Sequence, residues 1–231
     1  MFRPALLAAA LALTPAAFAA PAFRIDAAHP TVVELYQSQG CSSCPPAIAH
    51  VNAIADRPDV LTLTFAVTYW DQLGWKDTFA SAAQTDRQWD YARGFGHDQV
   101  WTPQVIVDGR SDVVGVRNGQ IEGLLARTPP RTGPALTLAA GSVAIGAGSA
   151  PAGGADVWLV RFDPRTIPVA VRAGENGGRT INHRNVVRQL VRLGRWSGAA
   201  ATLTLPAPAA GLKTAVLVQK TGGPVLAAVR G

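Results

Sequence analysis

The 231-residue chain predicts an α/β domain over residues 28–128, followed by a small, sandwich-like all-β domain over residues 134–231. Three observations predict this fold class. Before residue 128, β-rich runs alternate with stretches of helical periodicity. After residue 134, short runs of alternating apolar and polar residues follow one another between Gly and Pro turns. Between them, residues 128–134 form a stiff, turn-rich linker with three prolines and one glycine.

Residues 1–19 have the layout of a secretory signal peptide. Arg3 precedes an apolar run over residues 4–13, and small residues stand at Ala17 and Ala19. That run is too short for a stable bilayer anchor, although an uncleaved anchor is the alternative. We expect cleavage after Ala19 or Ala20, a periplasmic or secreted protein, and no stable membrane span after cleavage.

The first half of the chain alternates strands and helices. A helix pattern begins after Gly40, with Ile48, Val51 and Ile54 on one face. A second helix is expected over residues 77–93 with Asp77 as its N-cap, and a short third one over residues 121–127. The expected strands cover residues 31–36, 60–69, 105–107 and 113–116.

The second half predicts strands alone. Residues 185–196 have a period that fits a strand or a helix equally well. The expected strands cover residues 136–138, 143–145, 157–162, 169–172, 202–205, 214–219 and 225–229.

Both cysteines of the chain, Cys41 and Cys44, lie in one C-x-x-C motif. A disulfide across two intervening residues closes a very small loop and gives little entropic stabilisation, so chain stapling does not explain the pair. The free N–H groups and positive dipole end of a helix N-terminus stabilise a thiolate. We therefore expect Cys41 to be the more exposed, attacking sulfur and Cys44 to be the resolving one. The alternative is that the pair forms an inert disulfide, or stays as two reduced thiols in a protein that has lost exchange activity.

The element order, with C-x-x-C between the first strand and the first helix, resembles the thioredoxin superfamily. Thr102-Pro103 stands where that superfamily carries a cis proline before its third core strand. The resemblance implies a cis Pro103 packed beside the cysteine pair.

At closer range the chain resembles an uncharacterised family of secreted bacterial proteins known as domain of unknown function 1223. The resemblance covers nearly the whole mature chain and implies export and a thioredoxin-like fold, but no particular reaction. The matching stretches are residues 33–35, 38–46, 69–71, 73–77, 102–105, 174–176 and 185–188.

Three features depart from thioredoxins. Typical members carry a buried acid six residues before the first cysteine; here Leu35 has that spacing, and Glu34, a candidate for proton transfer, points to the opposite face of a regular strand. Pro45-Pro46 suits only the first turn of a helix, so the regular helix is expected to start nearer Ser43. The intervening Ser42-Ser43 adds hydroxyl groups but no cation.

The segment after the second strand is expected to emerge at the same sheet edge as Cys41. Trp70 and Trp75, together with Thr102 and Pro103, are the candidate substrate contacts, with Trp101 as a further member of an aromatic wall. Asp71 is a second candidate for proton transfer, although an Asp after a strand is more often a turn or cap residue.

Composition and charge exclude some classes of binding partner. The net charge of +6 is spread along the chain, without a basic run interleaved with aromatics, so nucleic acid is not an expected partner. No metal and no cofactor are expected, because His29, His50, His97 and His183 show no ligand spacing toward the cysteines.

The sequence thus predicts an exported thiol–disulfide oxidoreductase acting on protein thiols or disulfides in the cell envelope. The alternative is a non-catalytic envelope binding module with a structural disulfide. Whether such a protein oxidises, reduces or isomerises stays open at this point.

Overall fold

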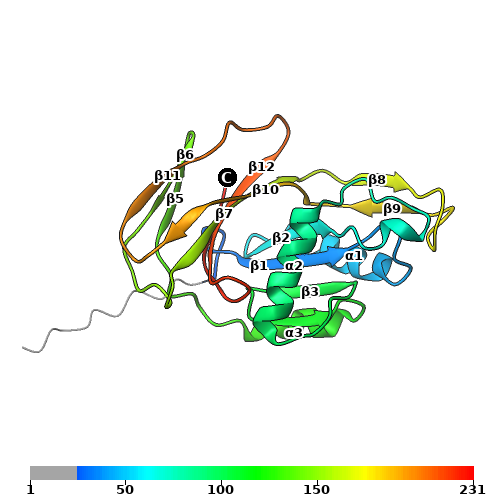
Figure 1. Cartoon of the computed structure of the whole chain (residues 1–231), viewed down its shortest axis with the longest axis horizontal. Helices are drawn as coiled ribbons and strands as arrows, with labels where there is room; N and C mark the ends of the chain where they lie inside the picture. The colour runs from blue at the N-terminus through cyan, green and yellow to red at the C-terminus, as the bar shows by residue number, and fades with distance from the viewer. Residues whose placement is uncertain (1–24) are drawn as a thin grey trace, which may run out of the picture.

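The structure, a computed structural model, describes residues 25–231, so the predicted signal peptide lies outside the described residues (Figure 1). Most strand and helix positions agree with the sequence patterns. The first part of the chain contains β1 (Thr31–Gln37), α1 (Cys44–Ala53), β2 (Val60–Ala66), the 3-10 turn η1 (Asp71–Leu73), α2 (Ala82–Phe95), β3 (Gln104–Val107), β4 (Ser111–Val114) and α3 (Asn118–Arg127).

The second part contains strands alone. Within residues 185–196, whose pattern fits a strand or a helix, Val186–Trp196 form the long strand β10, whereas no sequence pattern indicates β9. The strands are β5 (Leu136–Ala139), β6 (Ser142–Ile145), β7 (Ala155–Asp163), β8 (Ile167–Ala170), β9 (Thr180–His183), β10 (Val186–Trp196), β11 (Ala201–Thr204), β12 (Lys213–Gln219) and β13 (Val225–Arg230).

The predicted fold class, an α/β thioredoxin-like domain followed by a small all-β domain, is wrong. The described residues are mostly β, and one mixed eight-stranded sheet in the order β13-β12-β7-β10-β2-β1-β3-β4 draws strands from both halves of the chain. The junction is the parallel pairing of β10 with β2, where Val186 lies opposite Thr64 and the Thr64 amide donates to the Asn185 carbonyl. The division near residues 128–134 stays a prediction.

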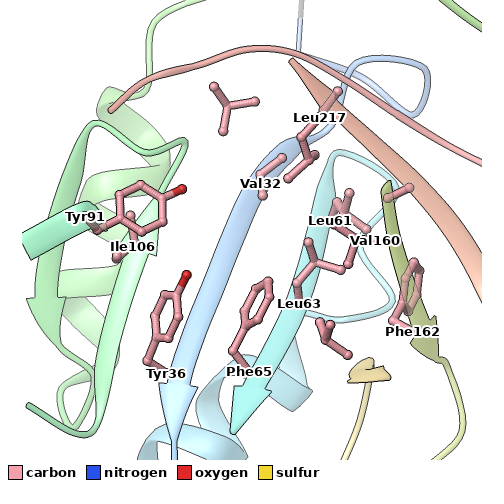
Figure 2. Packing of buried hydrophobic residues seen from close by; sticks show 14 of the residues in the cluster. Val32, Tyr36, Leu61, Leu63, Phe65, Tyr91, Ile106, Val160, Phe162 and Leu217 are labelled. Carbon is pink, nitrogen blue, oxygen red and sulfur yellow. The ribbon is translucent and has the colours of Figure 1, made fainter. Parts of the chain in front are cut away.

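The two faces of the large sheet are covered differently. On one face, α2 packs through Tyr91 over a cluster that runs from Ile106 in β3 to Phe162 in β7 (Figure 2). On the other face, Val33 and Leu35 of β1 pack with α1, with α3 and with the β8–β9 hairpin. The small sheet β11-β6-β5 packs on Val157 and Leu159 of β7. The apolar residues of β1 thus alternate between the two cores, as a strand buried on both sides requires.

Helix α2 begins five residues later than predicted. Ser81, not Asp77, occupies its N-cap position, and the Asp77 carboxylate instead accepts hydrogen bonds from the amides of Gln39 and Phe79. The tertiary contact with Gln39 therefore replaces the capping role that local sequence suggested. Within residues 25–231, no helix has the length and apolarity needed to cross a bilayer.

Candidate functional site

The cysteine pair lies in the turn between β1 and α1. The Cys41 amide donates to the Ser38 carbonyl at 3.2 Å, and the Cys44 amide donates to the Cys41 carbonyl at 3.1 Å. Helix α1 starts at Cys44 with Ser43 as N-cap, so Pro45 and Pro46 fall in its first turn, where no backbone N–H is needed. This confirms the later helix start that the two prolines predict.

Both sulfurs are thiols in this structure, and neither cysteine side chain has exposed surface. Cys41 thus has no solvent-exposed surface, although it lies less deeply in the protein than Cys44, in the order that the sequence predicts. Burial follows from the position of the pair: Cys41 and Cys44 belong to the same apolar cluster as Val33 and Leu35 of β1, with Trp70 packed against it.

The two thiols differ sharply in acidity. A hydrogen bond from the Cys44 thiol, helped by the Ser43 hydroxyl 3.3 Å from the Cys41 sulfur, lowers the pKa of Cys41 to about 6 against the opposing effect of burial. Burial, together with that bond to Cys41, raises the pKa of Cys44 well above its usual range. At neutral pH the site therefore holds a thiolate at Cys41 and a protonated thiol at Cys44.

Thr102 and Pro103 lie beside the pair. The Thr102–Pro103 peptide bond is cis, which confirms the prediction for Pro103. The Thr102 hydroxyl is among the groups that lower the pKa of Cys41. The Pro103 carbonyl accepts a hydrogen bond from the Gly115 amide, which ties this loop to the end of β4.

Trp70 and Trp75 also reach the site. Both are half-buried against the cluster that contains the cysteines, and the Trp75 indole donates to the Gln39 side chain at 2.9 Å. Trp101, which precedes Thr102, packs edge-on against His97 with ring centroids 5.0 Å apart. An aromatic wall for a substrate stays a prediction.

Glu34 is not brought to the sulfurs. It points away from Val33 and Leu35, into the core under α2, and is fully buried. Its carboxylate accepts two 2.8 Å hydrogen bonds from Arg87, and the hydroxyls of Tyr36 and Tyr91 donate to it as well. Both carboxylate oxygens of Glu34 are thus hydrogen-bonded on the face of β1 that points away from Val33 and Leu35, where they pair with the buried Arg87.

Asp71 binds the backbone of Asp77, which lies in the same loop. Its carboxylate accepts from the Asp77 amide at 3.0 Å. Asp77 is the more notable carboxyl of this loop: it is 3 % exposed, it binds the Gln39 amide at 2.7 Å, and burial raises its pKa to about 6. The sequence suggested Asp77 only as a helix cap, because the Gln39 contact spans 38 positions.

Two further residues of the site come from the turn between β8 and β9. The Asn176 side chain donates to the carbonyls of Gln39 and Cys41 at 2.9 and 2.8 Å, and the Glu175 carboxylate accepts from the Ser42 amide at 3.0 Å. The matching stretch over residues 174–176 was the one sequence signal for them, and it gave no role.

Over residues 25–231, no three His, Cys, Asp or Glu side chains gather as a set of metal ligands. The site consists of two thiols of opposite protonation, hydroxyl donors and an aromatic rim. That arrangement supports nucleophilic attack by sulfur.

Comparison with known proteins gives a family and a fold. A family model described as "Protein of unknown function (DUF1223)" matches residues 32–219. A crystal structure of a protein from Agrobacterium tumefaciens is 32% identical, with a TM-score of 0.71 over 88% of this chain and 94% of that one. HBP35 of Porphyromonas gingivalis, 12% identical, shares the fold with a TM-score of 0.52 over 88% of this chain and 75% of that one. No curated protein gives a match.

Proposed function

The chain belongs to the DUF1223 family, and from that starting point we propose that it carries out thiol–disulfide exchange through Cys41 and Cys44. The observation that carries the proposal is the pair of adjacent thiols at the start of α1, with the Ser43 hydroxyl 3.3 Å from the Cys41 sulfur. Exchange needs a thiolate to attack and a second thiol held in reserve to resolve the mixed disulfide. The pKa of about 6 at Cys41 and the raised pKa at Cys44 meet both needs at neutral pH.

In the first step, the Cys41 thiolate attacks one sulfur of a substrate disulfide. A Cys41–substrate disulfide forms, the substrate S–S bond breaks, and the other substrate sulfur leaves as a thiolate. In the second step, the Cys44 sulfur attacks Cys41, its proton passes to the departing substrate sulfur, and an intramolecular Cys41–Cys44 disulfide forms. The protein loses two electrons and the substrate disulfide becomes two thiols. The steps run in reverse when the substrate has the lower reduction potential.

The surroundings of the pair fit an extended protein substrate. The Thr102 hydroxyl, next to the cis Pro103, interacts with Cys41, and Trp70 and Trp75 pack against the cluster that contains both cysteines. We propose protein thiols or disulfides of the cell envelope as partners, in the periplasm or outside the cell, because residues 1–19 have a signal-peptide layout. Fractionation of producing cells, with the mass of the mature protein, tests this; we expect an envelope or secreted protein lacking its first 19 or 20 residues.

The decisive experiment is trapping of mixed disulfides in cell envelopes. Cys44→Ser leaves Cys41 free to attack but removes the resolving thiol, so it should accumulate mixed disulfides that a reductant releases. Cys41→Ser, the matched control, should accumulate none. Equal absence of trapped species in both variants would count against exchange.

Burial of both sulfurs favours the second candidate, a binding module in which the pair is only structural. Redox titration of the purified protein separates the two. A potential well below roughly −300 mV marks a structural disulfide, whereas an exchanging pair has a higher potential.

A further inference from the structure

The β8–β9 hairpin, here called the arm (residues 167–183), crosses from the β7–β10 region to α1 and the end of β1 (Figure 1). Val169, Val171 and Ile181 of the arm pack in the same cluster as Cys41 and Cys44. Between α1 and β9 a groove of about 500 Å³ remains, so contact between the helix and the arm is incomplete there. The arm contacts α1 through the Asn52 side chain, which donates to the Asn182 carbonyl at 2.8 Å, and its tip (residues 171–179) contacts the Cys41 turn.

Asn176 fixes the tip to the backbone on either side of Gly40. The Asn176 side chain is fully buried and its amide group donates to the carbonyls of Gln39 and Cys41. Its own side-chain oxygen accepts from Arg179 at 3.1 Å, which aligns the amide. One side chain from a different part of the chain thereby sets the path of the backbone that carries the attacking sulfur.

Glu175 adds a charge at the same place. Hydrogen bonds from the hydroxyl and the amide of Ser42 lower the pKa of Glu175, so this exposed carboxylate is ionised at neutral pH. The Ser42 amide directly follows Cys41 in the chain and precedes Ser43, the N-cap residue of α1. Glu175 accepts a hydrogen bond from that N–H and so places a negative charge at the residue next to Cys41.

Gly174 lets the tip sit against the η1 loop. A Cβ atom at Gly174 would lie 3.3 Å from the Trp75 Cβ and 3.4 Å from the Leu73 carbonyl oxygen, and its φ of +71° is left-handed. Only glycine meets both conditions without strain. The tip therefore touches both segments that flank the pair, the Cys41 turn and the Trp75 loop.

We propose that the arm tip is a cover over the cysteine pair, latched by Asn176 and Glu175, and that its release exposes Cys41 to a protein disulfide. The biological meaning of this cover rests on the proposed function, but the cover itself concerns only whether reagents can reach the Cys41 sulfur. A sulfur without exposed surface cannot meet a substrate disulfide in line, so some element must move. The arm tip is held to the Cys41 turn by three hydrogen bonds, few enough to break and reform.

The test measures alkylation of Cys41 by iodoacetamide in the reduced protein, read by mass spectrometry. Asn176→Ala removes both latching donors and should raise the rate at least tenfold. Asn182→Ala, an exposed asparagine of the same arm, is the control and should leave the rate unchanged. Equal rates in wild type, Asn176→Ala and Asn182→Ala would overturn the proposal.

The charge is tested by the pH profile of the same reaction. Ionisable groups near Cys41 include Cys44 from α1 and Tyr69 after β2, and Glu175 of the arm tip binds the amide of the next residue, Ser42. Glu175→Gln keeps an acceptor for the Ser42 amide but removes the charge, so the midpoint of the Cys41 profile should move to lower pH. Glu122→Gln, which neutralises an exposed glutamate on α3, should not move it. An unmoved midpoint in Glu175→Gln contradicts the electrostatic part.

Two readouts keep the cover and the exchange reaction separate. Amide hydrogen exchange at Ser42 in the wild type should show protection, and exchange at the rate of an unprotected amide would overturn the latch without any variant. Reduction of a fluorescent peptide disulfide measures the proposed function. If Asn176→Ala speeds alkylation but no form of the protein reduces the peptide, the cover stands and the exchange function fails.

Discussion

At the scale of single residues, the acidity of Cys41 depends on a small number of hydrogen-bond donors. The largest contribution comes from the thiol of Cys44, ahead of the Ser43 hydroxyl. The resolving thiol thus also activates the attacking one. Removing Cys44 should therefore change how Cys41 ionises, in addition to blocking the resolving step.

Cys44→Ala should shift the midpoint of Cys41 alkylation upward from about 6 toward the value of an ordinary thiol, because the strongest donor to the thiolate is gone. Cys44→Ser retains a hydroxyl donor and should keep most of the shift. Alkylation rates across pH 5 to 10 measure both variants. Coinciding profiles for Cys44→Ala and wild type would show that the activation has another source.

Glu34 is the residue for which a role in catalysis and a role in the core predict different results. Glu34→Gln leaves Arg87 as a buried guanidinium without its anionic partner, which should cost about 3–5 kcal/mol in the free energy of unfolding. The alkylation profile of Cys41 should keep its midpoint near 6, since Glu34 faces the other side of β1. Urea unfolding measures the first effect. A shifted profile at unchanged stability would instead assign Glu34 to proton transfer.

At the scale of elements, the connection from η1 to α2 is a structural support for the cysteine turn. Asp77 holds the Gln39 amide, and Trp75 holds the Gln39 side chain, so the residues before Cys41 are fixed from this loop. The burial of Asp77 lowers the stability of the folded state at neutral pH, because its carboxyl must ionise while it is buried.

Asp77→Asn should therefore change how stability depends on pH. Asp77 has a folded pKa raised to about 6 from an unfolded value of 3.8, so the folded state binds the extra proton between those values. Wild-type stability relative to Asp77→Asn is highest below pH 4 and falls as pH rises through 6, by about 3 kcal/mol in all. Urea unfolding at pH 4, 5, 6 and 7 gives this difference. A difference that does not vary with pH would mean that Asp77 stays ionised throughout.

Local patterns predicted most elements and the position of the cysteine pair at the start of α1, because periodicity, prolines and the C-x-x-C motif act over a few residues. Pairing did not follow from them. The strand pattern does not say which strands pair or which distant side chains meet. The pairing of β10 with β2 and the contact of Asn176 with Cys41, 135 positions away, therefore could not be predicted from it. Asp77 was misassigned for the same reason. The burial of Cys41 did not follow from local pattern either, because it depends on packing with residues distant in sequence, such as Val171 and Ile181.

At the scale of the whole molecule, the large sheet joins the two halves of the chain through its core. Arg87 of α2 binds Glu34 of β1 and also donates to the Gln219 side chain of β12 at 2.8 Å. Arg230, near the end of β13, donates to the carbonyls of Val60 and Pro58. These contacts cross the division expected near residues 128–134.

The protein should accordingly unfold in one cooperative transition. Exposing either half alone would leave buried polar groups, such as Arg87 and Gln219, without partners. Thermal unfolding followed by far-ultraviolet circular dichroism and by tryptophan fluorescence should give coincident curves. Two separated transitions would support two independent domains instead.

The long separation between Cys41 and Asn176 also has a consequence in time. A ribosome adds about 5–20 residues per second, so the 135 positions between these residues take on the order of 10 s to synthesise. Throughout that interval the nascent chain carries Cys41 and Cys44 while the residues that later close over them do not yet exist. The two thiols are therefore accessible to oxidants and reductants at two stages: first in the nascent chain, before residues 171–179 exist, and later in the folded protein when the arm tip opens.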